Sequence, residues 1–413
     1  MIDQIRNNID NPSVLEQLYR TNRSDFKNAF HLLYDELKQH PATPVWHARL
    51  NFEKQPAAAP TKTNEIWVVV LLSLFAGLIA KIPAMADIKE PDQFYPYNLS
   101  FIVFPSLIIY FIWKHRPGIK TALFPLAMLV LSVVFMNFLP KNLKNDAIIL
   151  SCLHMPLFLW LVTGYSYLGK EIFSTEKRID YLRHNGDIII VANVIALAGG
   201  VFSGVTIGLF NLININIEQF YLEYIVIFGA AATPLVSSYL VHANPMLVQK
   251  ISPIIARIFT PIVFLMLLIY LIMVVYTQKD PYNDREFLIL FNALLVGVMA
   301  IIFFSLSDAT KKGWRNFHLI VLFALSVLTL FVDAIVMSAI LFRISEWGIT
   351  PNRAAVLGES SLIFINLCMV SMRILNVVRK KCDAYSVEKA IGDFLPFYAI
   401  WFAIVAFLFP LIF

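Results

Sequence analysis

Apolar stretches of about 20 residues recur along the chain from Ile66 to its last residue, and short polar segments separate them. A helix of that length crosses the hydrocarbon layer of a bilayer, which is roughly 30 Å thick. The pattern predicts an all-α, polytopic transmembrane bundle. The eleven predicted spans are 66–86, 95–113, 119–139, 147–168, 188–212, 220–241, 254–276, 287–306, 317–342, 353–378 and 393–413.

Residues 1–55 have a different pattern, in which apolar residues recur at helical spacing among many polar ones. Asn11 followed by Pro12 is typical of a helix start, and Ser24 is a second candidate cap. We therefore expect a small soluble helical unit here. A segment rich in Pro and Ala predicts a linker over residues 56–65, so the transmembrane domain is expected to cover 66–413.

The composition supports a membrane protein. Of the 413 residues, 58% are hydrophobic and 15% are charged, whereas an ordinary soluble domain has about 25% charged residues. The net charge is only +5 and the basic residues lie in short loops, which argues against a nucleic-acid partner. The three cysteines have no spacing typical of a metal site or a disulfide framework, and no cofactor is predicted.

The loops also predict the orientation of the chain. At every alternation, the loops on one side of the membrane carry more Lys and Arg than those on the other. Because positively charged loops stay in the cytoplasm, residues 1–55 are expected there, with the C-terminus on the opposite side. An even number of spans would break this alternation.

Asp333 and Glu359 are carboxylates well inside long apolar runs, in the ninth and tenth predicted spans. A bare charge at bilayer depth costs roughly 3 kcal/mol or more, so such residues usually face a protein interior or a wet cavity. Counting the helical rise from the span ends places both in the outer half of the membrane. Asn366 follows Glu359 by seven residues and lies on the same helix face.

Other ionisable residues fall at a similar depth, and they are Lys81, His154, Glu223, Arg343 and Arg353. One interpretation is a polar cavity open to the outside that holds a charged head group, an ion or a proton, with Lys81 paired to Asp333 or Glu359. The other is that Lys81 and Glu223 extend to the interface while the two acids are neutral or hydrogen-bonded within the bundle. No catalytic residue and no metal ligand is assigned.

Small residues recur every four positions along the fifth predicted span. They include Ala196, Gly200, Gly204 and Gly208. Such a ridge lets a second helix approach closely, so it predicts a tight helix–helix contact.

The loop before the tenth span reads Glu346-Trp-Gly-Ile-Thr-Pro-Asn-Arg353. Thr350 and Pro351 are typical of a helix start. This stretch resembles the (Y/W)G-x-T-x-x-R signature of bacterial multi-pass proteins catalogued as domain of unknown function family 4153. The N-terminal Leu15-Glu-Gln-Leu-Tyr-Arg20 and Trp46-His-Ala-Arg-Leu50 look like the soluble segment of some members. The resemblance implies a protein of the bacterial cytoplasmic membrane and supplies no catalytic residues.

Three functions remain open from the sequence. The first is transport, channel or lipid-handling activity that uses the outward-facing polar cavity, with membrane lipids around it. The second is a sensor or assembly scaffold that binds a cytoplasmic partner through residues 1–55. The third is a membrane enzyme acting on lipid-linked substrates, which is disfavoured because the loops contain no acidic pair and the chain has no large soluble catalytic domain.

Overall fold

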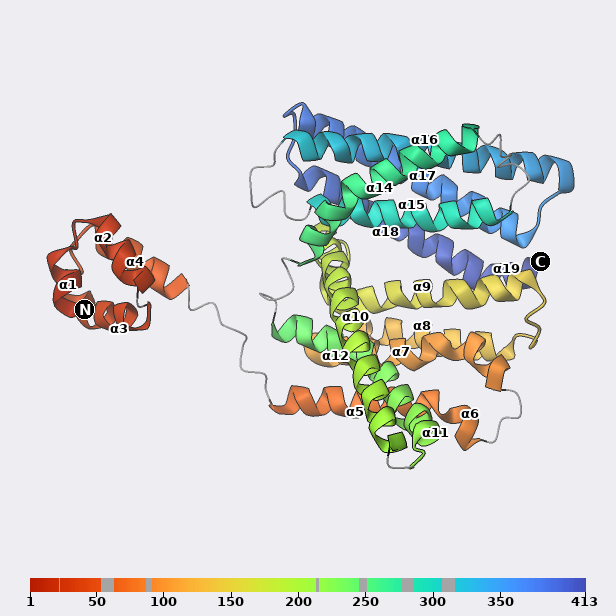
Figure 1. Cartoon of the computed structure of the whole chain (residues 1–413), viewed down its shortest axis with the longest axis horizontal. Helices are drawn as coiled ribbons and strands as arrows, with labels where there is room; N and C mark the ends of the chain where they lie inside the picture. The colour runs from red at the N-terminus through yellow and green to blue at the C-terminus, as the bar shows by residue number, and fades with distance from the viewer. Residues whose placement is uncertain are drawn as a thin grey trace. The chain divides into compact units, whose positions relative to one another are not determined.

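The computed structural model describes residues 1–21, 23–52, 63–86, 91–212, 215–244, 251–276, 285–306 and 316–413. Every element in these ranges is a helix, which confirms the predicted all-α fold (Figure 1). The chain forms two compact units, Met1–Thr61 and Lys62–Phe413. Most of the predicted linker, residues 56–62, lies outside the described residues.

The N-terminal unit contains four helices and an apolar core of its own. Its helices are α1 (Ile2–Asn7), α2 (Pro12–Thr21), α3 (Arg23–Leu37) and α4 (Ala42–Phe52). The predicted cap at Asn11 is present, since its Oδ1 accepts a hydrogen bond from the Val14 amide at 3.4 Å. Helix α3 begins one residue before Ser24, which therefore lies in its first turn. The rings of Phe26 and Trp46 pack at 5.0 Å between centroids and join α3 to α4.

The helices of the second unit correspond in order to the predicted spans. They are α5 (Thr63–Ala80), α6 (Ile82–Met85), α7 (Pro91–His115), α8 (Ile119–Phe138), α9 (Asp146–Leu168), η1 (Gly169–Glu171), α10 (Thr175–Leu212), α11 (Glu218–Phe220), η2 (Tyr221–Val226), α12 (Ile227–Ala243), α14 (Ile251–Tyr276), α15 (Arg285–Leu306), α16 (Asn316–Trp347), α17 (Pro351–Val378), α18 (Tyr385–Ala403), η3 (Ile404–Leu408) and α19 (Phe409–Ile412).

Eight helical stretches in the described part are long and apolar enough to cross a membrane. Shorter apolar stretches at Asn64–Ala80, Phe259–Ile269 and Leu294–Ser305 lie at the first, seventh and eighth predicted spans. The chain is thus a bundle of apolar helices compatible with a multi-pass membrane protein, and the number of spans stays a prediction.

Two helices begin well before the predicted spans. Helix α10 starts at Thr175 rather than at residue 188, and α18 starts at Tyr385 rather than at 393. The polar N-terminal portions of these two helices contact each other, because Arg183 forms an ion pair with Glu388 and the Thr175 hydroxyl donates to the Asp393 carboxylate. Hydropathy detects only the apolar part of a helix, so it missed the polar helical residues that these side-chain pairs stabilise.

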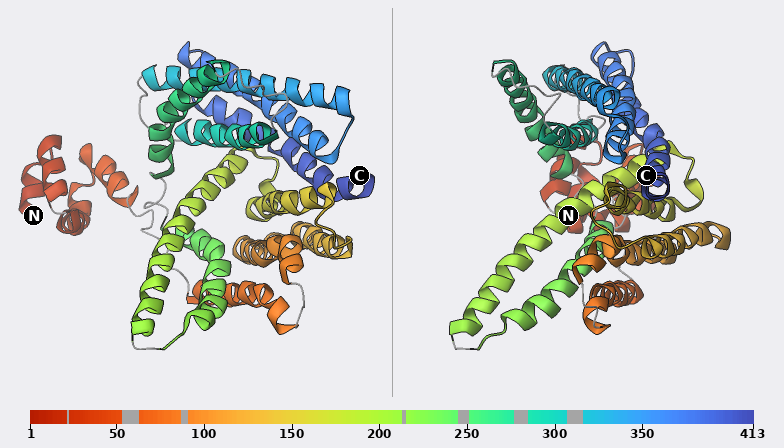
Figure 2. Two further views of the ribbon diagram at one scale, coloured as in Figure 1. Left: turned by 45° about the vertical axis from the view of Figure 1, so that its right-hand side comes forward. Right: turned by 90° about the vertical axis from the view of Figure 1, so that its right-hand side faces the viewer.

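The buried apolar residues of the membrane unit form two main clusters. The larger cluster contains residues of α10, α14, α15, α16, α17 and α18. The other contains residues of α7, α8, α9 and η3. Helices α16 and α17 run side by side (Figure 1). Helices α10 and α12 form a hairpin, in which α12 also packs along α5, and the tip of this hairpin near α11 extends beyond the other helices of this unit (Figure 2).

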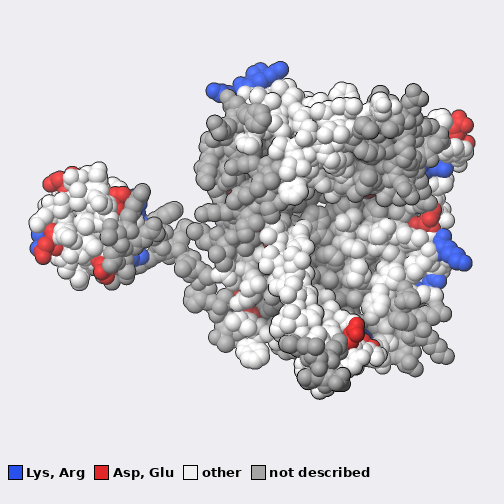
Figure 3. Space-filling view, viewed as in Figure 1, with Lys and Arg blue, Asp and Glu red and all other residues white. Residues whose placement is uncertain are grey.

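Charged side chains of the membrane unit are unevenly distributed. In the view of Figure 3 they are seen at the right-hand end of this unit, at its upper left corner and near the tip of the α10–α12 hairpin, and the described surface between the two ends is mostly uncharged. The helices of Figure 1 run mainly from one end to the other. This is the distribution expected of a protein whose middle faces lipid.

The predicted contact along the small-residue ridge is wrong for the described part of the chain. Ala196 is exposed, and a Cβ added to Gly200, Gly204 or Gly208 would meet no atom within 4 Å. None of the most apolar stretch of α10 is buried. Close approaches occur at other glycines instead, as at Gly358, where an added Cβ would lie 2.0 Å from the Trp401 ring.

Candidate functional site

The two predicted carboxylates lie on adjacent helices, Asp333 on α16 and Glu359 on α17. Asp333 is fully buried, and among the described residues neither of its carboxylate oxygens has a hydrogen-bond partner. Glu359 is near enough to act on Asp333 electrostatically. The tight connection at Gly348, which has a φ of +76°, turns the chain back so that α17 packs along α16.

Helix α18 adds a third polar side chain beside the two acids. The amide of Asn366 donates a hydrogen bond to the Tyr398 hydroxyl at 3.1 Å, while its carbonyl oxygen has no described partner. Tyr398 is within electrostatic range of both Glu359 and Asp333. We call Asp333, Glu359, Asn366 and Tyr398 the carboxylate cluster. Tyr398 was missed because nothing in its own helix marks it as the partner of a residue on α17.

The carboxylate cluster has more acceptors than donors. A buried ionised carboxylate without a partner is prohibitively costly, so the Asp333 side chain is stable either as the neutral acid or with a bound cation. A second acid nearby adds repulsion if both are ionised. The arrangement is therefore suited to holding and releasing a proton or a cation.

The expected pairing of Lys81 with Asp333 or Glu359 is wrong. The Lys81 ammonium lies 3.7 Å from the Glu223 carboxylate and 4.3 Å from the centre of the Tyr224 ring. Lys81 follows α5 directly, and α5 packs along α12, so the nearest acid comes from η2 at the start of that segment. Lys81 and Glu223 thus belong to a second site.

The remaining predicted residues have local contacts. The Arg353 guanidinium donates to the carbonyls of Trp347 and Gly348, at 3.1 and 2.7 Å, and so caps the end of α16. Thr350 accepts from the Arg353 amide at 3.3 Å, which confirms the predicted helix cap. Arg343 is buried on α16.

His154 is also satisfied locally. Its Nδ1 lies 2.8 Å from the Leu150 carbonyl oxygen of its own helix, and the side chain is buried. Among the described residues His154 makes no hydrogen bond to a carboxylate.

A cluster of histidines and aromatic rings lies where α7, α9, α10 and α12 meet, and sequence reasoning missed it. The rings of His184 and His242 are 4.3 Å apart between centroids, and Tyr167 stacks on His184 at 5.2 Å. His115 lies edge-on to Tyr167 at 5.5 Å. These residues come from helices far apart in the sequence, so no spacing could have revealed them.

Next to this cluster, α5 and α7 share a charged contact. The Lys114 ammonium donates to the Glu65 carboxylate at 2.6 Å and to the Tyr110 hydroxyl at 3.0 Å, and Tyr110 donates to Glu65 at 2.8 Å. Each polar group in this triad therefore has a partner. The triad fixes the start of α5 against the end of α7.

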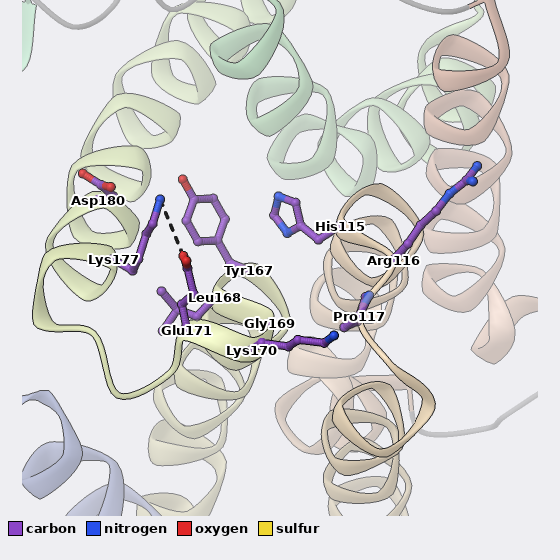
Figure 4. Close-up of a pocket in the computed structure, with 10 residues that line it drawn as sticks. All are labelled: His115, Arg116, Pro117, Tyr167, Leu168, Gly169, Lys170, Glu171, Lys177 and Asp180. Atoms are coloured by element: carbon purple, nitrogen blue, oxygen red, sulfur yellow. Dashed lines mark ion pairs between the residues drawn. The ribbon is translucent and has the colours of Figure 1, made fainter.

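A pocket of about 460 Å³ opens beside the histidine–aromatic cluster. Figure 4 shows Tyr167 between Lys177 and His115, and the ion pair of Lys177 with Glu171 at 3.6 Å. The backbone of Arg116, which also lines the pocket, has a positive φ of 44°, a conformation that costs energy for a residue with a side chain. The lining carries charges of both signs and can take a polar molecule. It consists of His115, Arg116, Pro117, Tyr167, Leu168, Gly169, Lys170, Glu171, Lys177 and Asp180.

Comparison with family models, curated proteins and solved structures gives no significant match to this chain. The functional argument therefore depends on the residues themselves.

Proposed function

We propose that this protein is a transport protein of the bacterial cytoplasmic membrane that binds protons or a cation at Asp333 and Glu359. One observation carries the proposal: Asp333 is fully buried, its two oxygens have no described hydrogen-bond partner, and a second acid acts on it. The excess of basic residues in alternate loops supports a cytoplasmic N-terminus and an external C-terminus.

The proposed chemistry is exchange between a proton and a cation. With a proton on Asp333, the cluster is neutral enough to remain in an apolar bundle. When that proton leaves, the carboxylate needs a positive partner, and a cation fills this role. Asp333 has no exposed surface in this conformation, so loading and release require α16, α17 and α18 to part, as in alternating access.

Labelling with dicyclohexylcarbodiimide tests this proposal without knowledge of the substrate. The reagent dissolves in the membrane and adds covalently to protonated carboxyl groups. We expect mass spectrometry to find the adduct on Asp333 or Glu359, with labelling reduced at high pH and by the transported cation. Glu388 is the matched control, because it is equally buried but ion-paired to Arg183. Absence of adducts at both acids, or equal labelling of Glu388, would contradict the proposal.

Proteoliposomes loaded with a pH-sensitive dye give a second test. We expect protein-dependent proton movement when a cation gradient is imposed, and loss of that movement in Asp333→Asn and Glu359→Gln. Glu346→Gln, an exposed acid at the end of the same helix as Asp333, should leave it unchanged. If both cluster variants move protons at the wild-type rate, the carboxylate cluster is not the binding site.

A scaffold role is the second candidate, because residues Met1–Thr61 form a separate compact unit with its own core. In this alternative the unit binds a cytoplasmic protein partner. Deletion of residues 1–55 separates the two functions: retained proton movement with loss of a co-purifying partner would show that the chain has both. Retention of every partner after the deletion would remove this candidate.

A further inference from the structure

An apolar groove of about 370 Å³ lies between α8, α9, α10 and α18, apart from the carboxylate cluster. Its walls come from Phe124 on α8, Phe158 and Leu161 on α9, and Ala399 and Ile400 on α18. The only charged side chain in the described lining is Arg178, on α10.

The groove runs along the helices from one end of the bundle toward its middle. On α9 its lining extends from Leu168, the last residue of that helix, to Phe158, ten residues earlier. Ten residues correspond to about 15 Å of helix, which is half of the roughly 30 Å hydrocarbon layer. The groove is therefore as deep as one leaflet.

Arg178 lies at the end of the groove where α9 finishes. Its Nε donates to the Ile172 carbonyl at 3.0 Å, which fixes the guanidinium beside the groove. In the described ranges no carboxylate is within ion-pair distance of it, whereas the preceding residue, Lys177, pairs with Glu171. A guanidinium with free N–H groups binds phosphate well, because its fork of donors matches two phosphate oxygens.

We propose that this groove binds one acyl chain of an anionic phospholipid whose phosphate lies against Arg178. The Arg178 guanidinium lies where the lipid headgroup would be, and the apolar walls line the path of the acyl chain. This matches the arrangement of polar and apolar parts in a lipid. The bound chain fills the space between α8 and α18, which both pack on α9. Filling that space restores dispersion contacts that a void would lose.

Native mass spectrometry of the full-length protein in detergent tests the headgroup contact. The probes are phosphatidylglycerol and phosphatidylcholine with identical acyl chains. We expect the wild type to bind one phosphatidylglycerol more tightly than phosphatidylcholine. Arg178→Gln should weaken phosphatidylglycerol binding about fivefold or more, which removes the preference. Lys177→Gln is the matched control, since Lys177 lines the neighbouring polar pocket and not the groove.

A second pair of variants tests the acyl-chain contact. Ala399→Phe places a ring in the groove and should reduce binding of both lipids, whereas Ala127→Phe, exposed on α8 outside the groove, should change neither. Thermal unfolding of each variant verifies that it folds. An unchanged headgroup preference in Arg178→Gln, or unchanged binding of both lipids in Ala399→Phe, would overturn the proposal.

Discussion

Arg183 on α10 and Glu388 on α18 form an ion pair in which one guanidinium nitrogen, Nη2, donates to both carboxylate oxygens, at 2.8 and 2.7 Å. Glu388 has no exposed surface, while the Arg183 side chain is 34% exposed. The pair joins two helices that are more than two hundred residues apart in the sequence. It also fixes the polar N-terminal portions of both helices against each other.

We expect a double-mutant cycle at this pair to show strong coupling. Arg183→Leu leaves the Glu388 carboxylate buried without a partner, and breaking such a pair costs about 3 kcal/mol or more. Glu388→Leu costs less, because the partly exposed guanidinium can reach water. The double variant should recover much of the loss. Unfolding of all four proteins in one detergent measures this, and additive single effects would contradict the coupling.

Two glycines with different surroundings test the helix contacts of the structure. Gly358→Ala should reduce stability by about 1–3 kcal/mol, because the new Cβ overlaps the Trp401 ring and forces it to move. Gly204→Ala should cause no loss, because it meets no atom, and alanine favours the helix by up to about 1 kcal/mol. The measurement is thermal unfolding of both variants. A larger loss of stability in Gly204→Ala than in Gly358→Ala would support the predicted ridge contact on α10.

The buried carboxyl group of Asp333 is expected to lower the free energy of unfolding of the protein. An unsatisfied buried polar group costs about 1–3 kcal/mol, so Asp333→Leu is expected to stabilise the protein by about 1 kcal/mol or more while proton movement is lost. Asp333→Asn keeps a polar group and should not gain stability. Unfolding and proteoliposome assays on the same preparations compare the two. If Asp333→Leu is the less stable variant, the carboxyl group has a partner.

The N-terminal unit should respond to acid through Glu36. Hydrogen bonds from Arg6, at 2.7 and 2.9 Å, lower the pKa of the Glu36 carboxyl below its ordinary value of 4.5. Because the folded pKa is the lower one, this contribution to stability is fully present above pH 4.5 and is lost as pH falls through the folded pKa. Hydrogen exchange of α1 and α3 in the whole protein should therefore increase in that window, and Arg6→Gln should remove the dependence.

The order and type of the helices could be read from the sequence. An apolar run long enough to cross the bilayer predicts a helix. In the hydrocarbon layer a helix satisfies every backbone amide within its own segment. Local signals were equally reliable, as the caps at Asn11 and Thr350 show. A buried acid such as Asp333 also stands out, because an ionisable residue inside a long apolar run is recognised without knowledge of its neighbours.

Which helices touch was decided only by the tertiary structure. Lys81 is paired with Glu223 rather than with Asp333, Tyr398 joins Asn366, and the glycine ridge of α10 has no described neighbour. Within a membrane, lipid covers an apolar helix face as well as another helix does, so hydrophobicity fixes the helices but does not select their partners. That selection depends on shape and on a few polar contacts between residues distant in the chain.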